Sequence, residues 1–194
     1  MDRPRRIIVG ISGASGIVLA IRVLEELRRQ SVETHLVVSK AGERTLQLEA
    51  DIGLEKLKGL ASVFHPIRDI GATIASGSFR TDGMIVIPCS VRSLAEIASG
   101  VTSTLLTRAA DVTLKERRRL VLVVREAPLH LGHIRNMATV TEMGAIVFPP
   151  SPAFYLRPKS VEDIIGNMAG RALDLLGFAA DIERWQGGGG ADGS

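Results

Sequence analysis

The chain has 194 residues, 45% hydrophobic but only 4% aromatic, so it is long enough for one domain with a mainly aliphatic core. The formal charge of +3 is mild, and the basic residues are dispersed apart from the run Lys115–Arg119, so a nucleic-acid-binding face is not required. The single cysteine, Cys89, excludes an internal disulfide framework. We see no signal peptide and no run of bilayer length, and predict a cytoplasmic protein that binds neither nucleic acid nor membrane.

The first predicted elements are a strand over 6–11 and a helix over 17–27, joined by a turn with glycines at Gly10, Gly13 and Gly16. Such a strand–turn–helix corner binds anions through free backbone N–H groups and the positive helix end. A dinucleotide site also expects an acidic residue at the end of the second strand. Here that strand, 33–38, ends in Ser39 and Lys40, which favours a mononucleotide over NAD.

The later elements continue to alternate between strands and helices. We predict helices over 41–49, 54–60, 94–98, 104–116, 134–143 and 160–176, strands over 62–64, 84–88, 120–124 and 145–148, and loops over 72–83 and 151–159. Unmixed apolar strands separated by helices indicate a mostly parallel sheet covered on both faces, a three-layer α/β fold. Residues 1–186 are predicted to form a single domain, and residues 187–194 a flexible Gly-rich tail.

Ligands of such a sheet bind outside the carboxyl ends of its strands. The residues that follow the strands are Ser12–Gly16, Ser39, Ser90–Ser93, Arg125–Glu126 and the segment after Pro149. Three of these five edges offer serine and one offers an Arg–Glu pair. This distribution is typical of a site for a phosphorylated ligand with a polar heteroaromatic body.

The motifs that carry chemistry resemble those of the UbiX-type flavin prenyltransferases. They are GISGASG at 10–16, SK at 39–40, LEAD at 48–51, SGSF at 76–79, PCS at 88–90, TRAADVTLKERR at 107–118, VREAPLHLGH at 124–133, PAFY at 152–155 and SVEDI at 160–164. The resemblance extends from Arg6 to Trp185. It implies a flavodoxin-like, Rossmann-like subunit and a homo-oligomer, a dodecamer in this family.

The resemblance also implies a reaction. Enzymes of this family move a dimethylallyl group from dimethylallyl monophosphate to N5 and C6 of reduced FMN without a metal. The prenylated FMN is passed to UbiD-type decarboxylases, in ubiquinone or aromatic-acid metabolism.

Site residues carry over by position. The resemblance implies flavin contacts at Gly13, Ala14, Ser15, Ser39, Ser90, Val91, Arg92, Ser93 and Arg125. It implies prenyl-phosphate contacts at Arg108, Lys115, Arg125, Tyr155 and Arg171, and catalytic roles for Ser15, Glu49, Lys115 and Glu126. Ile70 stands where some members have a tryptophan beside the prenyl group, and Trp185 matches a tail residue that covers the site.

Other interpretations remain open for some of these features. The charge run at Arg117–Arg119 is typical of a solvated helix end, and we predict that Cys89 is simply buried. His130 and His133 are predicted to be structural or surface residues rather than metal ligands. Two rival functions are a non-catalytic FMN carrier and a flavin-dependent cysteine-peptide decarboxylase of related fold. Conversion of FMN by the purified protein separates the carrier from the enzyme.

Overall fold

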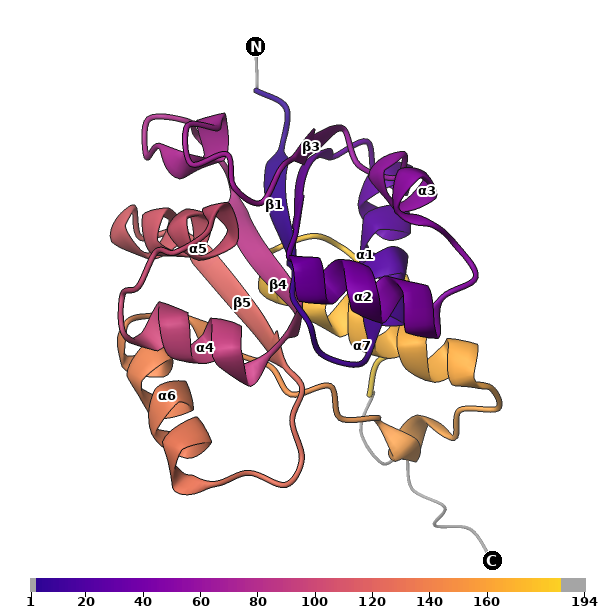
Figure 1. Ribbon diagram of the computed structural model, residues 1–194. Coiled ribbons are helices and arrows are strands. Elements are labelled where there is room, and N and C mark those ends of the chain that lie inside the picture. Colours follow the sequence, from indigo (N-terminus) through magenta and orange to yellow (C-terminus); the bar gives the residue numbers. More distant parts are fainter. Residues whose placement is uncertain (1–2, 186–194) are drawn as a thin grey trace, which may run out of the picture.

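A six-stranded parallel sheet forms the centre of the protein in a computed structural model that describes residues 3–185 (Figure 1). The strands are β1 (Arg6–Ile11), β2 (Glu33–Val38), β3 (Val63–His65), β4 (Gly83–Cys89), β5 (Arg119–Val124) and β6 (Ile146–Val147). Their spatial order is β3-β2-β1-β4-β5-β6, and every pair is parallel. The tail predicted for residues 187–194 lies outside the described residues.

Helices cover both faces of this sheet. One face carries α1 (Ile17–Arg29), α2 (Lys40–Glu49), α3 (Leu54–Lys58) and α7 (Val161–Leu175), and the other carries α4 (Val91–Ala98), α5 (Leu105–Lys115) and α6 (Leu131–Glu142). Each layer of helices encloses its own apolar core against the sheet. The predicted three-layer α/β fold is therefore confirmed. Single 3₁₀ turns, Thr73–Ala75 and Phe154–Leu156, lie within the two predicted loops.

Capping side chains explain where two helices begin earlier than predicted. The Ser90 hydroxyl accepts a hydrogen bond from the Ser93 N–H at 3.2 Å, so α4 begins at Val91. Nδ1 of His130 accepts from the Gly132 N–H at 3.0 Å, and α6 begins at Leu131. His130 thus has a structural role as a helix cap.

The order of the strands reverses between β1 and β4. The chain adds β2 and β3 on one side of β1, and then crosses to add β4, β5 and β6 on the other. Ser12, after β1, donates its hydroxyl to the Pro88 carbonyl at 3.0 Å and accepts the Ser90 N–H at 2.7 Å, which ties the two strand ends together. A crevice at such a reversal is where open α/β sheets bind ligands.

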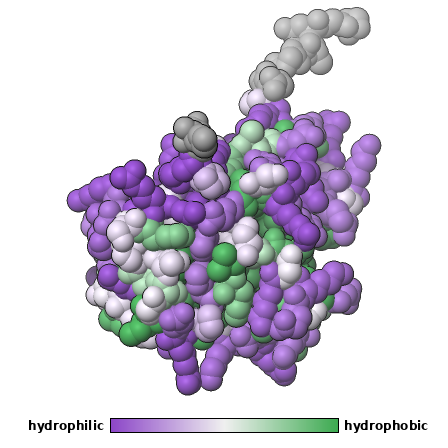
Figure 2. All heavy atoms as spheres, turned by 90° about the horizontal axis from the view of Figure 1, so that it is seen from above, coloured by the Kyte–Doolittle hydropathy of each residue, from purple (hydrophilic) through white to green (hydrophobic). Residues whose placement is uncertain are grey.

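Hydrophobic residues also reach the surface. Seen from the side of the N-terminus, they appear in patches between hydrophilic side chains, in the middle and on the left of the view (Figure 2). Large exposed hydrophobic side chains also occur in the segments that follow β5 and β6, at Leu129, Leu131, Ile134, Phe154 and Tyr155. None of the helices within residues 3–185 is both long and apolar enough to cross a membrane.

Candidate functional site

A cavity of about 300 Å³ lies at the strand reversal. Its lining includes five of the predicted flavin contacts, Gly13, Ser39, Ser90, Arg92 and Ser93. Three cationic side chains border it, Lys40, Arg68 and Arg92, whereas its single acid, Glu96, is paired with Arg92 at 2.9 Å. Hydroxyl donors and cations at a strand reversal fit the phosphate and the polar ring of a mononucleotide such as FMN.

The N-terminus of α1 is engaged by a carboxylate of the protein itself. Glu49, the last residue of α2, accepts the N–H groups of Gly16 and Ile17 through one oxygen, at 2.8 and 3.2 Å. A carboxylate at this position satisfies two free donors and the positive helix end. The glycine turn therefore holds Glu49, and the cationic side chains for a phosphate lie at the first turns of α2 and α4 instead.

Glu49 brings three predicted site residues together. Burial alone would raise the pKa of its carboxyl, but hydrogen bonds from the Ser15 hydroxyl and from the Gly16 and Ile17 N–H groups, with the positive charge of Arg125, hold that pKa below its usual value. Glu49 is thus ionised at neutral pH. A fixed negative charge between Ser15 and Arg125 is suited to stabilise positive charge that develops on a neighbouring ligand.

Arg125 and Glu126 follow β5 directly at the same edge. The Arg125 N–H donates to the Cys89 carbonyl at 3.1 Å, which fixes its backbone against the end of β4 while its side chain is exposed. Glu126 accepts the N–H of Ala127 at 3.0 Å. Arg125 therefore lies close enough to Glu49 for its charge to act on that carboxylate, and Glu126 is the next residue along the chain.

Lys115 lies at the other end of the same strand. It is the last residue of α5, and β5 begins four residues later at Arg119 and runs away from it to Val124. Six residues of strand span about 20 Å, more than one phosphate can bridge. The Lys115 ammonium pairs with Glu116 at 2.6 Å. Within one chain, Lys115 and Arg125 do not share a ligand.

Two arginines hold the loop between β3 and β4. Arg108 donates to the Ala75 carbonyl at 3.2 Å and pairs with Asp111 at 2.6 Å. Arg118 donates to the carbonyls of Gly77 at 2.6 Å and Phe79 at 2.8 Å, and its side chain is only 16% exposed. The prediction of a solvated Arg118 is therefore wrong, because this guanidinium caps loop carbonyls about 40 residues earlier in the chain.

Tyr155 and Arg171 lie outside the lining of the smaller cavity, and each has a different partner. The Tyr155 ring meets Trp185 edge to face, with 5.4 Å between ring centroids, so these two predicted residues are neighbours. Arg171 pairs with Asp174 at 2.8 Å, and Asp174 also binds Arg184. Tyr155 and Arg171 are both exposed.

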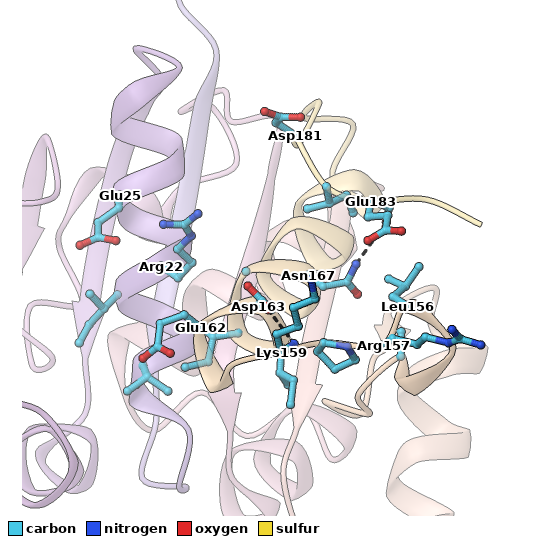
Figure 3. A pocket seen from close by; sticks show the side chains of 18 residues that line it. Arg22, Glu25, Leu156, Arg157, Lys159, Glu162, Asp163, Asn167, Asp181 and Glu183 are labelled. Atoms are coloured by element: carbon cyan, nitrogen blue, oxygen red, sulfur yellow. Dashed lines mark hydrogen bonds between the residues drawn. The ribbon is translucent and has the colours of Figure 1, made fainter. Parts of the chain in front are cut away.

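A larger cavity, of about 680 Å³, lies elsewhere, between α1, α7 and the segment after the second 3₁₀ turn (Figure 3). Arg22 and Glu25 of α1 and Asn167 of α7 line it, and Asn167 donates to the Glu183 carbonyl at 3.3 Å. None of the predicted flavin or prenyl-phosphate contacts lines this cavity. Its mixed acids and bases give no site for one anionic ligand, so the smaller cavity is the better candidate.

The remaining candidates behave as structural residues. Cys89 is fully buried, and burial raises the pKa of its thiol to about 12, so it supplies no thiolate. The rings of His130 and His133 stack with 3.6 Å between centroids. Among residues 3–185, no three or more His, Cys, Asp and Glu side chains are grouped to hold a metal ion.

The strand order, the cavity at the reversal and the serine in place of an acid after β2 define a mononucleotide-binding α/β protein. Residues 1–171 match the model of the Flavoprotein family. The chain is 55% identical to the flavin prenyltransferase UbiX of Neisseria meningitidis over 94% of its own length and 97% of the relative's. It belongs to the UbiX flavin prenyltransferase family.

Solved structures agree with this assignment. AnUbiX (PadA1), in complex with FMN and dimethylallyl pyrophosphate, superposes with a TM-score of 0.94 at 53% identity, over 95% of this chain and 99% of that one. A dodecameric FMN-dependent UbiX-like decarboxylase from Escherichia coli O157:H7 gives a TM-score of 0.92 at 48% identity, over 94% and 100%. The predicted family and flavodoxin-like fold are confirmed.

Some lining residues were not predicted from the sequence. Ile67 and Arg68, just after β3, and Ser103, Thr104 and Thr107, at the start of α5, all line the smaller cavity. Ile67 and Arg68 lie just after the end of a strand, as the predicted serines do. They were missed because β3 has only three residues and its sequence gives a weak strand signal. Ala14, Ser15, Val91 and Arg125, also predicted as flavin contacts, do not line this cavity.

Proposed function

We propose that the chain transfers a dimethylallyl group from dimethylallyl monophosphate to N5 and C6 of reduced FMN and releases prenylated FMN. The observation that carries this proposal is the grouping of Ser15, ionised Glu49 and Arg125 beside the cavity at the strand reversal. Reduced FMN supplies the nucleophilic atom. The protein orients both ligands, excludes water and stabilises charge.

Each residue has a proposed role in this reaction. Serines and cations of the cavity hold the flavin, and Arg125 takes the leaving phosphate through its planar guanidinium fork. Glu49 stabilises positive charge on the allylic carbon, while Glu126 accepts the proton that is lost when the second bond closes the new ring. Ser15 orients Glu49 through its hydroxyl.

A second copy of the chain completes the site in this proposal. Lys115 lies about a strand's length from Arg125, so both residues reach one phosphate only if they come from different subunits. Apolar surface for such contacts is supplied by exposed side chains that follow β5 and β6, namely Leu129, Leu131, Ile134 and Phe154. The E. coli relative is dodecameric. We propose a homododecamer here too, and Tyr155 and Arg171 as further phosphate contacts across an interface.

Subunit mixing tests the shared site. Lys115→Ala and Arg125→Ala are each expected to abolish transfer, and mixed oligomers of the two variants are expected to regain part of it, because some sites then contain both native residues. Mixing two separately prepared Arg125→Ala samples is the matched control. Mixed oligomers without activity would contradict a site built from two chains.

The experiment for the reaction itself is anaerobic. Purified protein, reduced FMN and dimethylallyl monophosphate are incubated, and the flavin fraction is read by mass spectrometry. A flavin heavier by one five-carbon unit is expected, together with free phosphate. A parallel incubation with the pyrophosphate tests the donor, since AnUbiX was crystallised with that compound. Unmodified FMN, bound tightly by folded protein, would instead support the carrier.

The destination of the product is part of the same proposal. A UbiD-type decarboxylase is expected to gain activity when it is mixed with this protein, reduced FMN and the prenyl donor, and to remain inactive when any one of these is left out. We also propose a cytoplasmic location and a single domain over residues 1–186.

A further inference from the structure

Two buried histidines lie at the sheet edge, outside the groups assigned above. His35 of β2 and His65, the last residue of β3, are 3% and 8% exposed. Their rings stack with 5.2 Å between centroids, and Nδ1 of His35 lies 2.9 Å from Nε2 of His65. Neither was singled out by its sequence context. Buried ionisable pairs are costly unless their hydrogen bonds are fully defined.

The neighbouring charges fix which nitrogen donates. Arg6 of β1 forms two hydrogen bonds with Glu33, at 2.7 and 2.8 Å, and these hold the pKa of that carboxyl below its usual value. An ionised carboxylate only accepts, so Nε2 of His35 donates to Glu33 at 2.8 Å. Nδ1 of His35 is then the acceptor, and Nε2–H of His65 donates to it.

His35 contacts both ends of the loop between β3 and β4. We call residues 66–79 the 66–79 loop; it starts directly after His65 and ends at Phe79, whose ring meets the His35 ring edge-on at 5.0 Å. Arg6 lies over the same Phe79 ring at 4.4 Å. The loop places Ile67 and Arg68 in the flavin cavity, and the Ile67 carbonyl accepts the N–H of Leu105 at 2.9 Å. It also carries Ile70.

We propose that His35 and His65 form a latch that positions the 66–79 loop against the flavin cavity, and that protonation of His65 releases it. The groups facing this pair are Glu33, Arg6 and Phe79, with Asp69 within the loop and Asp82 beside Arg6. The expected effect on FMN binding rests on the proposed flavin site, whereas the contact of the two histidines with the loop does not. His35 and His65 are positioning residues, because they act through the loop.

The direction of the pH effect follows from burial. Desolvation, with a contribution from His35, lowers the pKa of His65, so the latched loop keeps this ring neutral, whereas an opened loop lets it take up a proton. The closed loop is therefore stable above the free value, about 6.5, and loses stability as the pH falls below it. One proton with that free pKa favours opening by up to about tenfold at pH 5.5 relative to pH 7.5.

Amide hydrogen exchange on the full chain without flavin tests the latch directly. Peptides covering 67–78, corrected for intrinsic exchange, are expected to open up to about tenfold more at pH 5.5 than at pH 7.5. His65→Gln keeps an N–H that reaches Nδ1 of His35 but does not titrate, so its ratio is expected to be near one. His130→Asn, which alters a capping histidine remote from the loop, is expected to keep the wild-type ratio.

The FMN dissociation constant, measured at both pH values, tests the link to the cavity. In the wild type it is expected to rise by the factor one plus the opening constant of the loop, taken from the exchange data, and in His65→Gln it is expected to stay level. Phe79→Leu removes the contact at the other end of the loop, so it is expected to raise opening at both pH values without changing their ratio, and it replaces His65→Gln if that variant does not fold.

Three results would overturn the latch. They are a wild-type loop whose opening does not change with pH, a His65→Gln variant with the wild-type ratio, and a loop that is mostly open in acid while the FMN affinity stays constant. Failure to bind FMN at any pH would overturn the proposed function instead, and exchange of the loop would still decide whether the latch exists.

Discussion

Gly13 is expected to be the glycine at which a single methyl group does most harm to the site. It lies where the turn after β1 meets the first turn of α2. A Cβ on Gly13 would overlap the Cβ of Ala41 and lie 3.1 Å from the Ala41 carbonyl carbon and 3.2 Å from its Cα. Two of these atoms belong to the backbone, so the turn or the helix must move. Overpacking of this kind costs about 1–3 kcal/mol.

Urea denaturation of the flavin-free protein measures this cost, and a mutant cycle assigns its cause. Gly13→Ala is expected to lower the free energy of unfolding by about 2 kcal/mol and to weaken FMN binding, since Gly13 and Ala41 both line the cavity. Ala41→Gly removes the overlapping methyl, so the double variant should lose less than the sum of the single losses. Gly166→Ala is the control, because its nearest atom, at 3.9 Å, is the end of the Arg22 side chain, and alanine inside α7 should stabilise slightly.

Two results would refute this reasoning. If Gly13→Ala unfolds within a few tenths of a kcal/mol of the wild type, the close approach of the turn to α2 is absent in solution. If the costs of Gly13→Ala and Ala41→Gly simply add, the overlap with Ala41 is not the cause of the loss.

Four further predictions concern other residues of the site. Glu126→Gln should slow closure of the second bond more than formation of the first, read by mass spectrometry after quenching; a normal rate of the ring-closed product would remove Glu126 from the reaction. Glu49→Ala leaves two N–H groups without their acceptor, so it should be less stable at pH 7, and because the pKa of Glu49 is lowered, this deficit should shrink as the pH falls below about 4.5, as followed by urea denaturation. Arg118→Lys cannot serve both loop carbonyls and should raise hydrogen exchange in residues 76–79 severalfold, while Arg117→Lys, on an exposed side chain, should not. Cys89 should react with a thiol reagent only after unfolding, and rapid labelling of the native protein would contradict its burial.

The layers of the fold were predictable because their signals are local. The apolar runs of β1, β2 and β4 are buried on both faces, and their bounds agree with the predictions to within one residue. Two helices were predicted less well at their starts: α4 and α6 begin three residues early, at Val91 and Leu131, where Ser90 and His130 satisfy N–H groups of the first turn. The apolar periodicity from which those helices were predicted starts only further along.

The site was predictable where it follows strand ends and not where distant side chains meet. Ser39 and Ser90 were found because each ends an obvious strand. The anchoring by Arg118 and the contact of His35 with His65 join residues 41 and 30 positions apart, and no local pattern reports such a partner. A run of charges near a helix end looks the same whether its side chains face water or cap a neighbouring loop.

The position of Lys115 shows why motif and geometry must be combined. The segments LKERR and REAP are close in sequence, and both belong to the resemblance to one family. However, β5 lies between them and places them at opposite ends of its strand. A single chain therefore cannot bring Lys115 to the phosphate that Arg125 is proposed to hold. If Lys115 and Arg125 bind the same leaving phosphate, LKERR and REAP of one chain contribute to two different active sites. The catalytic unit is then an assembly of subunits. Activity should then fall with dilution below the concentration at which subunits dissociate, together with the loss of the oligomer in light scattering. An active monomer would refute the shared site.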